Sequence, residues 1–386
     1  MSILIVDDES DLELLVRQKF RRQIASGEMQ LTFALNGEEA LEKLGSDHAL
    51  DIIVSDINMP VMDGLTLLSH LIEYPRPVRA IIVSAYDDMP NIRTAMNRGA
   101  YDFLTKPLDF ADLETTLEKT RRELETIRAG MEARESLTAL HAELDIAMRI
   151  QQAILPETIT GHKAFEISAS MVPARQVSGD FYDFFLIDAN RLGVCVGDVS
   201  GKGIPAALFM AVSRTLLRAT ALHGGTPGEC LVHVNDVLLR QSKGELFVTL
   251  FYAILDLRTG GLDFCSGGQT APCVLTRTGQ VQFLREPRGF MLGLFEDATF
   301  TAGHTRLNPG DALVLYTDGV SEAQDEAARF YTEERLTAAL AELRDVPAER
   351  IVNHIFLDVN RFVKGYPQTD DITVVALRYC GAGNDE

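Results

Sequence analysis

The stretch "VCVGDVSGKGIPAALFMA", Val194–Ala211, connects a predicted buried strand to a predicted helix. Its apolar run stops at Asp198, glycines stand on both sides of Lys202, and a proline opens the helical segment. A carboxylate at a strand end, followed by a glycine-rich turn, is typical of a phosphate-binding loop or of a metal site. The two interpretations predict different partner residues elsewhere in the chain.

The phosphate-loop interpretation fails on its spacing. A Walker loop has a glycine, four further residues, and then Gly-Lys-Ser/Thr, whose hydroxyl binds Mg²⁺. Here Val196 stands where the first glycine is required, and Gly203 follows the lysine in place of a hydroxyl residue. The stretch therefore favours a metal site.

Carboxylates at other strand boundaries support the metal interpretation. The segment "VSGDFYDFF" places Asp180 in a Gly-Asp turn, and "LVLYTDGVSEA" ends an apolar run at Asp318. The segment "TDDITVVALR" places Asp370 and Asp371 directly before the last predicted strand. One such residue alone is typical of a turn. Several remote carboxylates together, as oxygen ligands, indicate Mg²⁺ or Mn²⁺.

The bulk composition restricts the class of protein. A chain of 386 residues is expected to form two or three domains. Its net charge of -20 argues against a nucleic-acid partner, because phosphate backbones select basic surfaces. Five cysteines without a CxxC spacing indicate reduced thiols. With no long apolar run and an acidic N-terminus, we expect a cytoplasmic protein without a membrane segment.

The first 108 residues alternate short apolar runs with amphipathic segments. The runs are "SILIVDD", "LTFAL", "DIIVSD", "AIIVSA" and "DFLTKP". This alternation predicts an α/β domain with a doubly wound parallel sheet covered on both faces. The carboxyl ends of parallel strands line one crevice, and here they carry acidic, hydroxyl and lysine residues. The acidic side chains suit Mg²⁺, while a hydroxyl and a lysine suit a phosphoryl group; the residues are Asp7, Asp8, Asp56, Ser84 and Lys106.

With these residues and the loop "INMPVMDG", residues 1–120 resemble a response-regulator receiver domain. The resemblance implies that Asp56 is the phosphoacceptor and that the Lys106–Pro107 bond is cis. It also implies a histidine kinase or phosphotransfer protein as partner. The implied Mg²⁺ ligands are Asp8, Asp56 and the carbonyl of Asn58, with Asp7 in support; Ser84 and Lys106 would hold the phosphoryl oxygens, and Ser84 and Phe103 would form the switch pair.

Residues 110–155 predict a helical linker. Apolar positions recur at heptad spacing, which favours a coiled coil and a homodimer. The alternative is one long amphipathic helix lying on a domain. The seam is Leu113, Leu117, Thr120, Leu124, Ile127 and Met131, and it resumes one residue out of phase at Leu137, Leu140 and Leu144.

Residues 156–382 predict an α+β unit with short antiparallel strands, because turns such as Thr259-Gly260 join alternating runs. From Glu143 to Arg378 the chain resembles PPM-type serine/threonine phosphatases of the bacterial sporulation and stress-response branch. The segments that carry the resemblance are "ELDIAMRIQQAILP", "GDFYD", "GDVSGKGIPAAL", "YTDGVSEA" and "DDITVV".

The resemblance implies a β-sandwich with two Mn²⁺ or Mg²⁺ ions between its sheets. Asp198 would bridge both ions, Asp180 and the Val199 carbonyl would bind one, and Asp318 and Asp370 the other. Asp371 is a weaker candidate ligand, and Arg175 would bind the substrate phosphate. Two segments depart from the family pattern: "SGGQTAP", Ser266–Pro272, replaces Ala-Gly-His-Asn-Pro-Pro, and "VSGD" replaces "VGGD".

The predicted function is therefore a phosphorylation-controlled, metal-dependent protein serine/threonine phosphatase. Two bound ions would acidify a shared water, which attacks phosphorus in line without a protein nucleophile. The family resemblance implies a phosphorylated STAS-type anti-sigma-factor antagonist as substrate. The alternative is a non-catalytic adaptor, gated by phosphorylation, that binds a sigma factor or another regulator.

Overall fold

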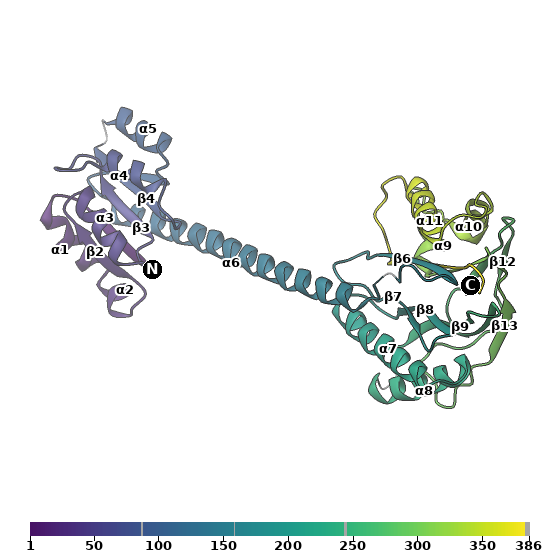
Figure 1. Ribbon diagram of the computed structural model, residues 1–386. Coiled ribbons are helices and arrows are strands. Elements are labelled where there is room, and N and C mark those ends of the chain that lie inside the picture. The colour runs from purple at the N-terminus through teal and green to yellow at the C-terminus, as the bar shows by residue number, and fades with distance from the viewer. Residues whose placement is uncertain (86–87, 158, 243–244, 383–386) are drawn as a thin grey trace. The chain divides into compact units, whose positions relative to one another are not determined.

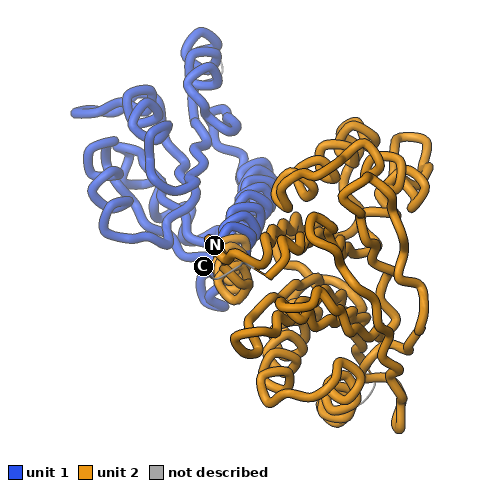
Figure 2. The backbone as a smooth tube through the Cα atoms, turned by 45° about the vertical axis from the view of Figure 1, so that its right-hand side comes forward, with its two compact units in different colours: residues 1–140 blue, residues 141–386 orange. Residues whose placement is uncertain are grey.

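The computed structural model describes residues 1–85, 88–157, 159–242 and 245–382. It divides into two compact units, residues 1–140 and residues 141–386 (Figure 2). None of the helices in these ranges is long and apolar enough to cross a membrane.

Unit 1 contains a five-stranded parallel sheet in the order β2-β1-β3-β4-β5 (Figure 1). This confirms the doubly wound sheet predicted from the sequence. Strands β1 and β3 are buried throughout, which explains their unbroken apolar runs. The strands are β1 Ser2–Val6, β2 Gln30–Ala34, β3 Ile52–Asp56, β4 Arg79–Ala85 and β5 Asp102–Lys106.

Helices cover both faces of this sheet. One core joins the sheet to α3, α4 and α5, and the other joins it to α1 and to the start of α6. The helices are α1 Ser10–Lys19, α2 Arg21–Ala25, α3 Gly37–Ser46, α4 Gly64–Leu71, α5 Met89–Asn97 and α6 Phe110–Ile154.

Helix α6 is continuous over 45 residues and belongs to both units. The first part of its heptad seam, at Leu113, Leu117 and Leu124, is buried in the core of unit 1. That part therefore packs on its own domain, as the alternative interpretation predicts, and is not available to a coiled coil. The later seam positions Met131, Leu137 and Leu140 are exposed.

Unit 2 is a sandwich of two five-stranded antiparallel sheets, as the sequence predicts. The first sheet, in spatial order, is β13 Ala302–Arg306, β10 Gly261–Gly267, β9 Val248–Asp256, β8 Arg191–Val199 and β7 Phe181–Leu186. The second is β12 Val281–Phe283, β11 Cys273–Leu275, β14 Ala312–Tyr316, β15 Ile372–Tyr379 and β6 Phe165–Val172.

The core between the sheets is formed by inward-facing residues such as Val196, Phe251 and Leu315. Helices α7 Ile204–Leu222 and α8 Pro227–Ser242 pack on the outer face of the first sheet. Helices α9 Asp318–Ser321, α10 Thr332–Ala341 and α11 Ala348–Val363 pack on the outer face of the second (Figure 1). The acidic segments of the sequence lie where strands of the two sheets end.

Candidate functional site

The predicted phosphorylation site lies at the carboxyl edge of the parallel sheet in unit 1. Asp7 follows β1 and Asp56 ends β3, and both are buried, whereas Asp8 is exposed. Their carboxylate oxygens lie within 4.8 Å of one another. Three hard oxygen donors this close fit a Mg²⁺ ion, which would offset their mutual repulsion.

Lys106 compensates part of this negative charge. Its Nζ lies 2.6 Å from Oδ2 of Asp56 and 3.2 Å from Oδ2 of Asp7. Burial lowers the pKa of Lys106, but the hydrogen bond to Asp56 and the two negative charges outweigh burial, so the pKa is raised. Lys106 therefore stays protonated and holds a positive charge beside the predicted phosphoacceptor.

Of the remaining predicted residues, Asn58 contacts the Asp56 carboxylate directly. The backbone N–H of Asn58 donates to Oδ1 of Asp56 over 3.4 Å, and the Lys106–Pro107 bond is cis. The hydroxyl of Ser84 is buried and donates to Asp88, while Phe103 is partly exposed. Gly64 ends the loop "INMPVMDG" but had no predicted role, and an added Cβ there would lie 2.2 Å from the Asp56 carbonyl oxygen. Only glycine fits at that position.

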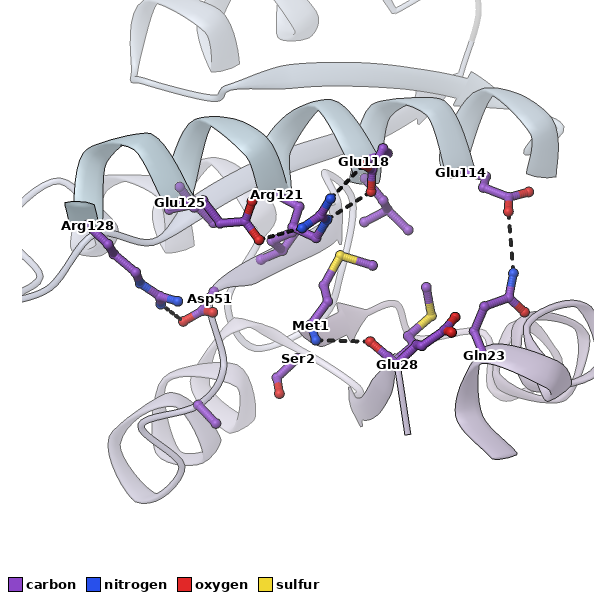
Figure 3. A pocket seen from close by; sticks show the side chains of 15 residues that line it. Met1, Ser2, Gln23, Glu28, Asp51, Glu114, Glu118, Arg121, Glu125 and Arg128 are labelled. Carbon is purple, nitrogen blue, oxygen red and sulfur yellow. Dashed lines mark hydrogen bonds and ion pairs between the residues drawn. The ribbon is translucent and has the colours of Figure 1, made fainter. Parts of the chain in front are cut away.

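A cavity of about 840 Å³ lies at the opposite edge of this sheet, between α6 and the start of β1 (Figure 3). Two residues of α6 make polar contacts along this cavity. Glu114 accepts a hydrogen bond from Gln23, and Arg128 forms an ion pair with Asp51. Within it, Arg121 is already paired with two glutamates of its own helix. These contacts hold α6 on unit 1, and the polar groups are satisfied by one another, so we assign no ligand to this cavity.

Unit 2 brings the four remote carboxylates into electrostatic contact. Burial is the largest cause that raises the pKa of Asp198, and the charges of Asp318 and Asp370 raise it further, to about 7. Burial and then the charge of Asp198 raise the pKa of Asp180 well above its ordinary value. For Asp318 the causes that raise the pKa are burial, Glu322 and Asp370. Bound divalent cations would offset the mutual repulsion of such carboxylates, as the sequence-based prediction of a metal site requires.

These carboxylates are less tightly clustered than those of unit 1. Among the described residues, the trio of Asp7, Asp8 and Asp56 is the one group of three or more with ligand atoms all within 4.8 Å. The two-ion site predicted for Asp180, Asp198, Asp318 and Asp370 therefore stays a prediction. Lys202 lies beside the group, with its Nζ 3.2 Å from Oδ2 of Asp370.

Two buried threonines orient Asp180. The hydroxyls of Thr317 and Thr373 donate to its Oδ2 over 2.7 Å and 2.6 Å. The other carboxylate oxygen of Asp180, Oδ1, takes no part in these two hydrogen bonds. Next to it, a Cβ at Gly179 would lie 3.0 Å from the Val199 carbonyl oxygen. The absence of a side chain at Gly179 therefore lets this loop lie close to the Val199 carbonyl.

Asp371 braces the loop that carries Asp180. Its carboxylate accepts hydrogen bonds from the N–H of Ala174 (2.7 Å), the hydroxyl of Ser178 (2.7 Å) and the N–H of Gly179 (2.9 Å). The bond from the Ser178 hydroxyl gives a role to the serine of the segment "VSGD". The three bonds together give Asp371 a role in the geometry of this loop. Arg175 is exposed on the same loop, and no side-chain partner for it is found in the described part of the chain.

Two glutamines in this site were not predicted. Gln269 of the segment "SGGQTAP" accepts a hydrogen bond from Thr249, the strand partner of Asp198, and donates to the Tyr316 carbonyl over 3.4 Å. It thus connects the two sheets beside the acidic group. Gln151, near the end of α6, pairs with both backbone groups of Ser178, over 2.7 Å and 2.9 Å. Gln151 belongs to the segment "ELDIAMRIQQAILP", which carries part of the family resemblance, but no role was predicted for this residue.

Replacing Thr373 by valine is expected to weaken Mn²⁺ binding by about tenfold, as is typical when a group that orients a ligand is lost. Valine keeps the shape of this buried side chain but removes the hydroxyl that donates to Asp180. The measurement is Mn²⁺ titration by calorimetry. Thr373→Ser, which keeps the donor, is the matched control, and equal weakening in both variants would contradict the orienting role.

The geometry defines the class of the protein: an α/β domain with an acidic cluster at the carboxyl edge of its parallel sheet, and a β-sandwich with buried carboxylates at its strand ends, connected by one helix. Residues 3–118 match the family model of the response regulator receiver domain, and residues 188–379 match that of stage II sporulation protein E (SpoIIE). The chain therefore combines a receiver domain with a SpoIIE-type phosphatase domain.

Individual curated proteins are similar to part of this chain. Protein IcfG of Synechocystis sp. is 30% identical over 271 residues, which are 61% of this chain and 41% of that protein. Phosphoserine phosphatase RsbU of Bacillus subtilis is 28% identical over 239 residues, covering 62% of this chain and 70% of that protein. The chain thus spans less than half the length of the first of these curated relatives.

Solved structures show the same fold for the second unit. The SiaA-PP2C domain of Pseudomonas aeruginosa aligns with a TM-score of 0.56 at 23% identity. The alignment covers 63% of this chain and 98% of that domain. At this level of identity the likeness establishes the fold alone.

Proposed function

We propose that this chain is a response regulator in which phosphorylation of Asp56 controls a metal-dependent protein serine/threonine phosphatase. The observation that carries the proposal is the group of Asp180, Asp198, Asp318 and Asp370. Burial and repulsion between carboxylates raise the pKa of the first three. Ionising these carboxyl groups in the folded state therefore costs free energy unless cations are bound to them. RsbU and RsbP of Bacillus subtilis, both named phosphoserine phosphatases, are similar to this chain at 28% and 25% identity.

The side chains divide the work of the reaction. When bound, two Mn²⁺ or Mg²⁺ ions supply the Lewis acidity that activates water and offsets phosphoryl charge. Asp198 would be their shared ligand, with Asp180 and the Val199 carbonyl on one side and Asp318 and Asp370 on the other. Thr317 and Thr373 fix the orientation of Asp180, and the bonds of Asp371 fix its loop. Arg175, exposed on that loop, would bind the substrate phosphate.

The substrate we propose is a phosphorylated STAS-type anti-sigma-factor antagonist, as the family resemblance implies. The competing interpretation is a non-catalytic adaptor, and the presence of all four carboxylates argues against it. The test is phosphate release from p-nitrophenyl phosphate and from phosphoserine peptides with Mn²⁺. Hydrolysis that stops with EDTA supports the phosphatase, whereas no hydrolysis of any substrate favours the adaptor.

Helix α6 is the element we propose for communication between the units. It begins in the core of unit 1 through Leu113 and Leu117, and its last turns place Gln151 against Ser178, two residues before Asp180. The exposed seam around Leu137 is the surface for a homodimer. A histidine kinase or phosphotransfer protein would phosphorylate Asp56, and a change in the helix or its dimer would then reach the Asp180 loop.

Replacing Asp56 by asparagine is expected to abolish the response of phosphatase activity to an acyl-phosphate donor. The asparagine amide cannot accept the phosphoryl group, and it removes the partner of Lys106. The measurement is peptide dephosphorylation with and without acetyl phosphate, beside Asp112→Asn, an exposed carboxylate of the same unit. Equal wild-type rates in both conditions would remove the proposed control while leaving the phosphatase assignment intact.

A further inference from the structure

A groove of about 360 Å³ begins at the acidic centre of unit 2. Asp370 and Gly319, the residue after Asp318, line one end, and Val363 and Gly365 line the other. Its buried lining residues are Ala323, Val359 and Ile372, and its more exposed ones include Gln324, Asn360, Tyr366 and Gln368. An apolar floor with a polar rim is the usual chemistry of a site that takes one side chain of a ligand.

The loop that forms one wall of this groove is held in place. Helix α11 ends at Lys364 and Gly365, both with positive φ, which turns the chain back toward β15. The amide of Gln368 donates to the carbonyls of Val172 (2.8 Å) and Asp370 (2.7 Å). Lys202 donates to the Thr369 carbonyl over 2.8 Å. The groove is therefore preformed and does not depend on a ligand to order it.

A smaller cavity of about 240 Å³ lies against the same segment, and its lining is basic. It contains the exposed side chains of Arg335, Arg361 and Lys364, which we call the cationic rim. In the described ranges no carboxylate forms an ion pair with any of these three; Arg335 stacks over the Phe362 ring at 4.5 Å.

The lining of this cavity carries more positive than negative charge, because Arg329, Arg335, Arg361 and Lys364 stand against Asp325 and Glu326. Asp325 is occupied by Arg329 at 2.5 Å, and Asp358 accepts from the Tyr331 hydroxyl. Glu326 is exposed and lines the same cavity. In a chain with a net charge of -20, this local excess of positive charge favours an acidic ligand.

We propose that the groove and the cationic rim dock the part of the phosphoprotein substrate that flanks its phosphorylated residue. With the phosphoryl group at the acidic centre, an apolar side chain of the substrate fills the groove and an acidic side chain pairs with Arg361 and Lys364. This inference rests on the proposed phosphatase function and adds a substrate class: phosphoproteins with an apolar and an acidic residue near the phosphoserine.

The test compares synthetic phosphoserine peptides, made with the apolar and acidic residues on either flank. For each, matched peptides replace the acidic residue by glutamine or the apolar residue by glycine. We expect kcat/KM with Mn²⁺ to be about tenfold higher for the full motif on one flank, the factor that about 1.4 kcal/mol of binding supplies. Equal kcat/KM for all peptides overturns the docking proposal.

Two variants test which residues cause the preference: one changes the cationic rim, and the other changes the groove. Arg361→Glu is expected to reduce the ratio between acidic and glutamine peptides to about one, because a like charge repels the acidic side chain. Arg350→Glu, the same change on the first turn of α11, should keep the ratio; equal effects of both variants count against the rim. Asn360→Trp fills the groove and should remove the preference for the apolar residue, and an unchanged preference counts against the groove.

The failure of this inference is distinguishable from failure of the proposed function. The wild-type protein is assayed in parallel on p-nitrophenyl phosphate, which is too small to use the groove. Hydrolysis of that substrate without any peptide preference overturns the docking site alone. No hydrolysis of either substrate overturns the phosphatase assignment, and the docking proposal with it.

Discussion

The variant Asp198→Asn is expected to hydrolyse p-nitrophenyl phosphate about a thousandfold more slowly than the wild type, because a bridging metal ligand supports several kcal/mol of transition-state stabilisation. Asp198 stands next to the end of β8, pairs with Thr249, and interacts with Asp180, Asp318 and Asp370. An amide keeps the size of the side chain but has one neutral oxygen donor where the carboxylate offers two charged ones. Both ions would therefore be bound more weakly.

The measurement is kcat/KM over a series of Mn²⁺ concentrations. The matched control is Asp188→Asn, an exposed turn carboxylate paired with Arg191, which should behave like the wild type. If Asp198→Asn keeps most of the activity at saturating Mn²⁺, Asp198 is not the shared ligand. If neither the variant nor the wild type is active, the chain acts as an adaptor.

The site in unit 1 could be predicted from sequence because a parallel sheet brings its strand ends together by topology alone. Once the apolar runs fix the strands, Asp7, Asp56 and Lys106 must meet at one edge. Gly64 was missed because its requirement is a contact with the Asp56 carbonyl, which no local pattern shows.

The acidic centre of unit 2 required a different kind of information. Its carboxylates come from strands of two sheets, so their positions at strand ends suggested a metal site, but the role of each ligand came only from the family resemblance. The groups that orient them, Thr317, Thr373 and Gln269, depend on how the sheets face each other. A buried threonine or glutamine has no distinctive period in sequence, so its role appears only when its partner is in place.

The heptad pattern of α6 is compatible with two kinds of packing, on a globular domain or in a coiled coil. Leu113, Leu117 and Leu124 repeat as in a coiled coil, yet they pack on the sheet of unit 1. An amphipathic helix on a globular core and a helix in a dimer both need one apolar stripe. The sequence gives the stripe but not the surface that covers it. After Met131 the stripe is exposed, so that part alone can serve a dimer.

The metal-free phosphatase unit is expected to lose stability as the pH rises from about 4 to above 7, by up to about 4 kcal/mol from Asp198. Burial and the charges of Asp318 and Asp370 raise the pKa of folded Asp198 to about 7, above its ordinary value in the unfolded chain. The folded state therefore holds a proton that the unfolded state releases. The stabilisation is complete at low pH and is lost as the pH rises through 7.

Thermal unfolding of the full chain in EDTA, at about pH 5 and about pH 8, measures this effect as the difference between wild type and Asp198→Asn. Asparagine resembles the protonated carboxyl, so the variant should be only slightly more stable than the wild type at the lower pH and clearly more stable at the higher one. Added Mn²⁺ should stabilise the wild type at the higher pH, because the cations bind the folded state. A difference between the proteins that does not change with pH would show that Asp198 is not held in a repulsive acidic group.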